Sequence, residues 1–231
     1  MNKALLITMS LVVSTIFLSA CGDKNEEDDL IRKGFPSLVD TYCVPSTISF
    51  EKADKYAEQS YLIMKCGAVG KSYSYDAKNE QEKVAFEKYA RSFGDTLADG
   101  NHYTVHNTVS VLPLVSVSVT ADKQYDEKHP SNSLLNDLVC IDADRDFKYA
   151  IEYKLEHGKW CYGQDKLERS IDSISADNPV YMLSESFNLH FKKNPDTFGT
   201  YNLTINMKFG ADPVTGETVE IDPIKVQMEF K

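Results

Sequence analysis

Residues 201–209, Tyr-Asn-Leu-Thr-Ile-Asn-Met-Lys-Phe, alternate apolar and polar side chains along the whole stretch. Successive side chains of a β-strand point to opposite faces, so this alternation predicts a strand with one buried face. The same period of two recurs at residues 109–119, 187–191 and 224–230, and Pro113 is expected to break the first of these stretches. Turn-rich segments separate the strands without helical crossovers, which predicts an antiparallel β-sandwich over residues 101–231.

Residues 147–155 show the cleanest alternation in the chain. Phe147, Tyr149 and Ile151 share one parity, and Lys148 and Glu152 share the other. We expect a strand here that turns at residues 157–158 into a hairpin with residues 159–162.

The N-terminal third, residues 34–100, is expected to be partly helical. Its clearest helix spans residues 80–93, with Asn79 suited to the start and Gly94 to the end. A weaker helix is expected over residues 50–66. The stronger helix has an apolar stripe at helical spacing, made of Phe86, Tyr89, Ala90, Phe93 and Leu97. The predicted fold class is therefore mainly β, of the α+β type.

The first twenty residues have the chemistry of a secretory signal. Lys3 gives a positive start, residues 4–18 are almost wholly apolar, and Leu18-Ser19-Ala20 places small residues before Cys21. The apolar run is shorter than the roughly 20 residues that a membrane-spanning helix needs. Leu18-Ser19-Ala20-Cys21 also resembles the lipobox of bacterial lipoproteins. That resemblance implies a signal peptide, residues 1–20, that is cleaved, and a lipid anchor on Cys21. The alternative is an ordinary signal with a chance cysteine.

Residues 21–33 are expected to form a lipidated acidic tether. Gly22 to Asp29 reads Gly-Asp-Lys-Asn-Glu-Glu-Asp-Asp, which is typical of a solvated linker. An acidic run directly after the lipidated cysteine also resembles the export signal of Bacteroidetes surface lipoproteins. The resemblance implies an outer membrane lipoprotein, at the cell surface or at the periplasmic face.

The segments Val117–Asp126 and His129–Asp137 resemble uncharacterised lipoproteins of Bacteroidetes. In those proteins, a strand ending near T-x-D-K-x-Y-D leads into H-P-x-G-S-x-L-N-D. This sequence departs from the pattern at Asn132, where the family has glycine. The resemblance implies an Ig-like fold and carries no known activity.

The chain's length and charge restrict its partners. Residues 34–231 fit a single domain. The formal net charge of −10 argues against nucleic acid and against anionic membrane surfaces as partners.

Four cysteines remain for the domain once Cys21 is lipidated. They allow three disulfide connectivities, and buried free thiols are the other reading. No CxxC spacing points to zinc or redox chemistry. The four are Cys43, Cys66, Cys140 and Cys161.

Asp142, Asp144 and Asp146 form the most suggestive local cluster. Alternating carboxylates on a turn can converge on a hard cation such as Ca²⁺, the one cofactor that the sequence suggests. Phe147 stands where an EF-hand loop requires glycine, so only a different kind of calcium site fits. The other reading is a solvated acidic turn.

The sequence lacks a nucleophile elbow and a glycine-rich phosphate loop, so we expect no catalysis. It favours a non-catalytic binding or interaction module for a protein or a glycan. One alternative is a small glycan-acting hydrolase with two carboxylates in a cleft. Another is a structural or assembly lipoprotein whose strand Ile224–Phe230 pairs with a partner strand.

Overall fold

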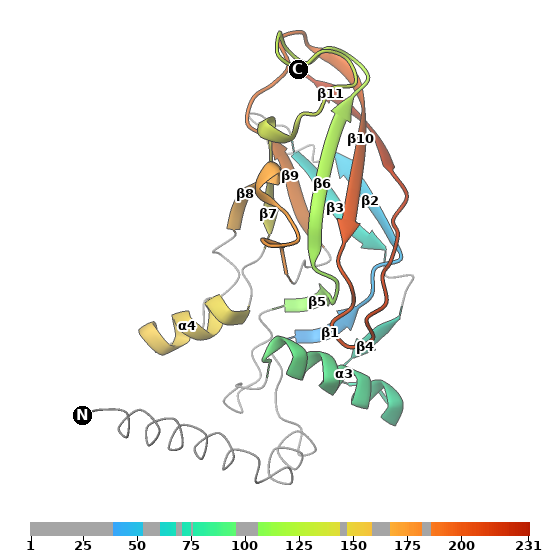
Figure 1. Cartoon of the computed structure of the whole chain (residues 1–231), viewed down its shortest axis with the longest axis vertical. Helices are drawn as coiled ribbons and strands as arrows, with labels where there is room; N and C mark the ends of the chain where they lie inside the picture. The colour runs from blue at the N-terminus through green and yellow to red at the C-terminus, as the bar shows by residue number, and fades with distance from the viewer. Residues whose placement is uncertain are drawn as a thin grey trace, which may run out of the picture. The chain divides into compact units, whose positions relative to one another are not determined.

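The computed structural model describes residues 39–52, 61–67, 71–74, 76–95, 106–143, 147–158, 167–181 and 186–231. They belong to one folded unit, residues 37–231. Within the described ranges the strands form three sheets, and two α-helices accompany them (Figure 1). The fold is mainly β, as the sequence predicts.

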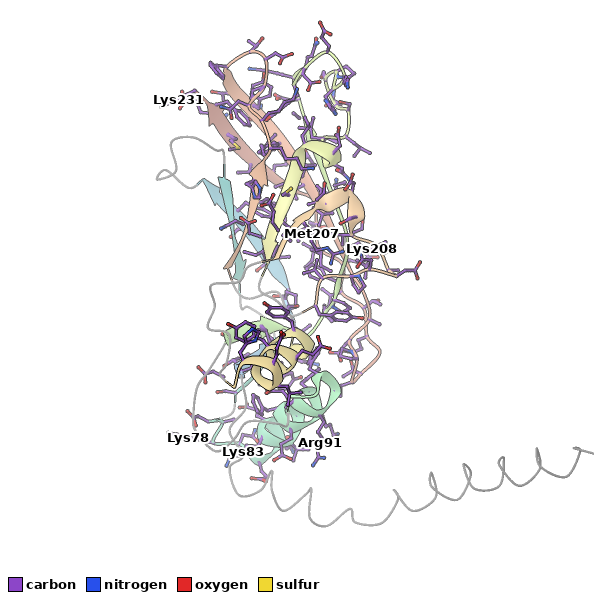
Figure 2. The ribbon with its side chains drawn as sticks, turned by 90° about the vertical axis from the view of Figure 1, so that its left-hand side faces the viewer. Lys78, Lys83, Arg91, Met207, Lys208 and Lys231 are labelled. Atoms are coloured by element: carbon purple, nitrogen blue, oxygen red, sulfur yellow. The ribbon has the colours of Figure 1, made fainter. Side chains whose placement is uncertain are left out.

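The first sheet has the strand order β11-β10-β6. Both neighbours of β10 (Gly199–Phe209) run antiparallel to it: β6 (Leu114–Ala121) and β11 (Ile224–Phe230). The predicted alternation is confirmed, since Met207 is buried and its neighbour Lys208 is exposed (both labelled in Figure 2).

The second sheet has five strands in the order β2-β3-β9-β7-β8, and every neighbouring pair is antiparallel. Its inward face carries Phe187, Leu189 and Phe191 on β9, all fully buried. The strands are β2 (Thr47–Lys52), β3 (Tyr61–Gly67), β9 (Ser186–Phe191), β7 (Val139–Ala143) and β8 (Leu167–Ser170).

An aromatic cluster joins these two sheets, which lie face to face (Figure 1). Phe191 of the five-stranded sheet has its ring centroid 5.4 Å from that of Phe230 on β11. Tyr125 lies between the sheets, with its ring 5.6 Å from both Phe191 and Phe230. Tyr201 on β10 completes the group at 5.3 Å from Phe230. Edge-to-face and offset pairs of this kind stabilise packing beyond the buried area alone.

The third sheet has the order β4-β1-β5 and contains a parallel pair. Strand β1 (Val39–Cys43) runs parallel to β5 (His106–Ser110) and antiparallel to β4 (Ser72–Ser74). No strand was predicted for residues 39–43, and the parallel pairing of β1 with β5 differs from the antiparallel pairing that was predicted for residues 101–231. Since β5 ends at Ser110 and β6 begins at Leu114, the expected break around Pro113 is confirmed.

Helix α3 (Glu80–Phe93) packs on this third sheet, and its predicted bounds are confirmed. The side chain of Asn79 accepts a hydrogen bond from the backbone N–H of Gln81 (2.9 Å), and Gly94 ends the helix with φ of 71°. The ring of Tyr42 on β1 lies 5.2 Å from that of Phe86. The buried face of α3 consists of Phe86, Tyr89 and Ala90, which belong to the predicted stripe; Phe93 is half-buried, and Leu97 lies outside the described residues.

Two sequence predictions of secondary structure are wrong. Residues 50–66 were expected to be helical, but β2 and β3 pair there as antiparallel strands, with Phe50 opposite Met64. Side chains of β2 alternate between buried and exposed, as a strand requires: Ile48 and Phe50 are buried, and Ser49 is exposed. The pairing supplies the hydrogen bonds that a helix would otherwise provide.

The expected strand at residues 147–155 is also wrong, because Phe147–His157 forms helix α4. Tyr149, Tyr153 and His157 follow one another at a spacing of four, which places them on one helix face. Their rings contact in sequence, at 6.0 Å and 4.1 Å between centroids. Alanine, leucine, glutamate and lysine in the same stretch are also good helix formers. Residues 159–162, the expected second strand, lie outside the described residues.

An ionic network around the buried Asp126 and His129 holds the loop that follows β6. Asp126 accepts hydrogen bonds from the backbone N–H groups of Lys128 and His129 and from the ammonium of Lys193. His129 places Nδ1 2.6 Å from Asp126 Oδ1 and Nε2 3.0 Å from Asp137 Oδ1. The network ties the loop after β6 to the loop after β9.

Asn132 lies in the same loop and has φ of 64°, in the left-handed region. Glycine adopts this conformation without steric cost, and asparagine tolerates it better than most residues. Asn132 therefore adopts the left-handed backbone conformation that this turn requires without a glycine.

We expect Phe230→Ala to lower the free energy of unfolding by about 3–5 kcal/mol, because it removes a buried ring that contacts three others. Phe198→Ala is the matched control, since Phe198 is 63% exposed and should change stability by less than about 0.5 kcal/mol. Urea denaturation of the full chain in mild detergent measures both. Equal effects of the two substitutions would contradict the assigned core.

The stability contributed by His129 should fall as pH rises. Burial opposes protonation of His129, but its hydrogen bonds to Asp126 and Asp137 outweigh burial and raise its pKa. A raised pKa in the folded state stabilises the fold below the unfolded value of about 6.5. That stabilisation is lost as pH rises through the folded pKa. The stability difference between the native chain and His129→Gln should therefore be largest near pH 5 and shrink towards pH 8.5.

Urea denaturation across this pH range measures the difference. His157→Gln serves as the control, because His157 is exposed on α4. A difference between native chain and His129→Gln that grows with pH would contradict the network.

Candidate functional site

A polar groove lies on the outer face of the β11-β10-β6 sheet. Its volume is 530 Å³, and it extends across all three strands and the loop after β6. The core-facing residues of these strands point away from it, so the alternation that fills the core leaves polar side chains here. Its polar lining includes Thr120, Asp122, Asn202, Thr204, Lys225 and Gln227.

Asp122 and Asn202 are joined by two hydrogen bonds in the groove. The backbone N–H and the side-chain amide of Asn202 donate to the Asp122 carboxylate at 2.8 Å and 2.6 Å. These hydrogen bonds lower the pKa of Asp122, so its carboxylate is ionised at neutral pH. Gln227 Nε2 reaches the Asn202 Oδ1 at 3.4 Å. The three side chains thus form a hydrogen-bonded row from the loop to β11.

The groove combines donors and acceptors with a single carboxylate in its lining. Hydroxyls, amides and the Lys225 ammonium can form hydrogen bonds with a polar ligand. Glycoside hydrolysis requires two carboxyl groups about 5–10 Å apart, one of them with a raised pKa. Since the pKa of Asp122 is lowered, the described lining suits binding better than proton transfer.

A second cluster lies on the outer face of the five-stranded sheet. Cys140 on β7, Glu168 on β8 and His190 on β9 place one ligand-type atom each within 4.8 Å of one another. The strand register brings them together, since Cys140 lies opposite His190 and Glu168 lies opposite Asp142. Thiol, imidazole and carboxylate are the ligand types of transition-metal sites.

The imidazole of His190 lies between two carboxylates. Its Nδ1 lies 3.3 Å from Asp142 Oδ2, and its Nε2 lies 3.5 Å from Glu168 Oε1. Cys140 is 3% exposed and His190 is 6% exposed, although both lie on the face away from the core. Glu168 is exposed. The cluster is therefore accessible from the side of β8.

The Cys140 thiol is not activated as a nucleophile. Burial raises its pKa, the Lys192 ammonium opposes this, and the Glu168 carboxylate adds to it. A reactive cysteine needs the opposite shift, because the thiolate is the attacking species. The raised pKa therefore argues against a Cys-His nucleophile here.

The structure places one of the three predicted calcium ligands. Asp142 lies on β7, beside His190, and Asp144 and Asp146 lie outside the described residues. A Ca²⁺ site on these aspartates stays a prediction. Sequence reasoning missed Glu168 and His190, because their proximity to Cys140 depends on pairing between distant strands.

The predicted cysteine positions are partly described. Cys43 is buried in β1, and Cys140 is a buried free thiol. Cys66 lies in β3 at the register position opposite Ile48. Cys161 and the predicted lipidation site Cys21 lie outside the described residues. The disulfide pairings stay predictions.

No family model, curated protein or solved structure matches this chain. Of the helices that the structure describes, neither is long and apolar enough to cross a membrane.

Proposed function

We propose that this chain is an exported, lipid-anchored binding module without catalytic activity, and that it binds a glycan in the polar groove. The observation that carries the proposal is the groove itself, on the outer face of β6, β10 and β11. Its floor is formed by regular strands. Such a floor holds side chains in fixed positions before a ligand arrives, which lowers the entropic cost of binding.

The lining of the groove fits sugar hydroxyls. Each hydroxyl both donates and accepts, so it pairs best with a mixed set of side chains. The Asp122 carboxylate accepts, the Lys225 ammonium donates, and the amide of Gln227 does both.

Within the mainly β class, we propose that the fold is an Ig-like β-sandwich. Two antiparallel sheets that share one core support it, as does the resemblance of residues 117–137 to Bacteroidetes lipoproteins. The β4-β1-β5 sheet with α3 would then be an addition to the sandwich.

A second candidate is an assembly role through strand addition. Strand β11 is at the edge of its sheet and pairs with β10 on one side only, within the residues described. An edge strand presents backbone groups that a partner strand can pair with. This observation favours the assembly reading over the hydrolase reading.

A glycan array tests the groove. We expect the full chain to bind a subset of glycans, and Lys225→Ala/Gln227→Ala to weaken that binding by at least about tenfold, from the loss of two polar contacts. The matched control is Asn206→Ala/Lys208→Ala, which removes one amide and one ammonium from the same sheet face outside the groove lining. Absence of glycan binding by the native chain would contradict this proposal and leave the β11 edge as the candidate.

The proposed location is the outer membrane, at the cell surface or the periplasmic face. The lipobox Leu18-Ser19-Ala20-Cys21 and the acidic residues that follow support it. The partners that we propose are thus the membrane, through lipid on Cys21, and a glycan at the groove. Two or more acyl chains give a stable anchor, at about 0.8 kcal/mol for each buried CH₂ group.

Cys21→Ala should move the protein from the membrane fraction to the soluble fraction, or leave an uncleaved precursor. Fractionation followed by mass spectrometry of the N-terminus separates these outcomes. Cys43→Ala is the control and should leave the distribution unchanged, since Cys43 is buried in the fold. A mature, membrane-associated Cys21→Ala protein would contradict the anchor.

A further inference from the structure

We propose that Cys140, Glu168 and His190 bind one Zn²⁺ ion on the outer face of the five-stranded sheet, with Asp142 orienting His190. The three ligands come from three adjacent strands, β7, β8 and β9. Because neighbouring strands hold them in register, the site depends on the sheet and not on a loop. This site is separate from the proposed glycan groove, which lies on the β11-β10-β6 sheet.

The distances fit a tetrahedral ion. Ligands at about 2.0–2.1 Å from a tetrahedral zinc lie about 3.3 Å from each other. His190 Nε2 and Glu168 Oε1 lie 3.5 Å apart, close to that edge length. The three ligand atoms lie within 4.8 Å of one another, so small side-chain rotations would bring all three to one ion.

The ligand set selects the ion. A thiolate with an imidazole favours zinc and similar borderline ions, whereas Ca²⁺ and Mg²⁺ require oxygen ligands. The cluster carries the carboxylates of Glu168 and Asp142 within reach of a divalent cation. The ammonium of Lys192 is the opposing charge near Cys140, and it donates to Ser170 Oγ at 2.9 Å.

Asp142 has a distinct role in this site. A histidine that binds a metal through one ring nitrogen commonly donates from the other to a carboxylate, which fixes the ring and its tautomer. Asp142 Oδ2 lies 3.3 Å from Nδ1 of His190, while Nε2 faces Glu168. Asp142 is thus a positioning residue, in contrast to the direct calcium ligand that its sequence context suggests.

Zinc binding includes one proton transfer. The Cys140 thiol loses its proton to solvent as the sulfur bonds to Zn²⁺, and no oxidant or reductant takes part. Affinity should therefore rise with pH, because the competing proton becomes less available.

Metal titration of the full chain in detergent tests the site. We expect one Zn²⁺ per chain, measured by competition with a chromophoric chelator, and a thiolate-to-metal charge-transfer band when Co²⁺ replaces zinc. Cys140→Ser should remove that band and weaken zinc binding by about 100-fold or more. Asp142→Asn should weaken binding by about 10–100-fold and keep the band, as a positioning role requires.

The controls separate this site from the chain's other thiols and carboxylates. Cys43→Ser and Glu229→Gln should bind like the native chain, since neither residue belongs to the cluster. Glu168→Gln covers the case in which Cys140→Ser fails to fold, because Glu168 is exposed, and it should lower affinity at least about tenfold. A native chain without stoichiometric zinc, or a Cys140→Ser or Glu168→Gln chain that binds zinc like the native one, would overturn the proposal.

Discussion

The packing of Phe191 against Phe230 joins the two larger sheets, and the rest of the arrangement depends on it. Tyr125 and Tyr201 fill the space around this pair, so four rings from β9, β10, β11 and the loop after β6 form one contact. Rings of this size bury more apolar surface than most aliphatic side chains. Once the sheets are joined on these faces, their other faces must point outward, where the polar groove and the thiol cluster lie.

Hydrogen bonds then fix the loops at the same end of the sheets. The Tyr125 hydroxyl donates to the Lys193 carbonyl at 2.7 Å, and the Lys193 ammonium pairs with Asp126. Asp122 and Asn132, which line the groove, belong to this same loop after β6. The network at Asp126 therefore has a consequence at the surface. It restricts the loop that forms one wall of the groove. The side chains of that wall are therefore held in place before a ligand binds.

The sequence predicted those elements in which burial on one face decides the pattern. The alternation of β10 and the apolar stripe of α3 each follow from a single buried face, so one chain segment contains the signal. Residues 147–157 fit both the helical and the strand period. Tyr149 and Tyr153 are four residues apart, which places them on one face of a helix and also on one face of a strand. Here alternation predicted the wrong element. The contact of Cys140 with His190 has no local signal at all, because it depends on β7 pairing with β9, about 50 residues away.

The two candidate sites follow from the same constraint, with different consequences for substitution. Groove residues such as Gln227 are exposed and contribute little to packing, so their substitution should leave the fold intact. Cys140 and His190 are buried outside the main core, where polar groups are costly unless they are paired. The carboxylates of Asp142 and Glu168 lie close to the imidazole, and a bound cation would balance their charge. The free-energy cost of burying these polar groups on an outer sheet face is thus lower with a bound metal ion than without one.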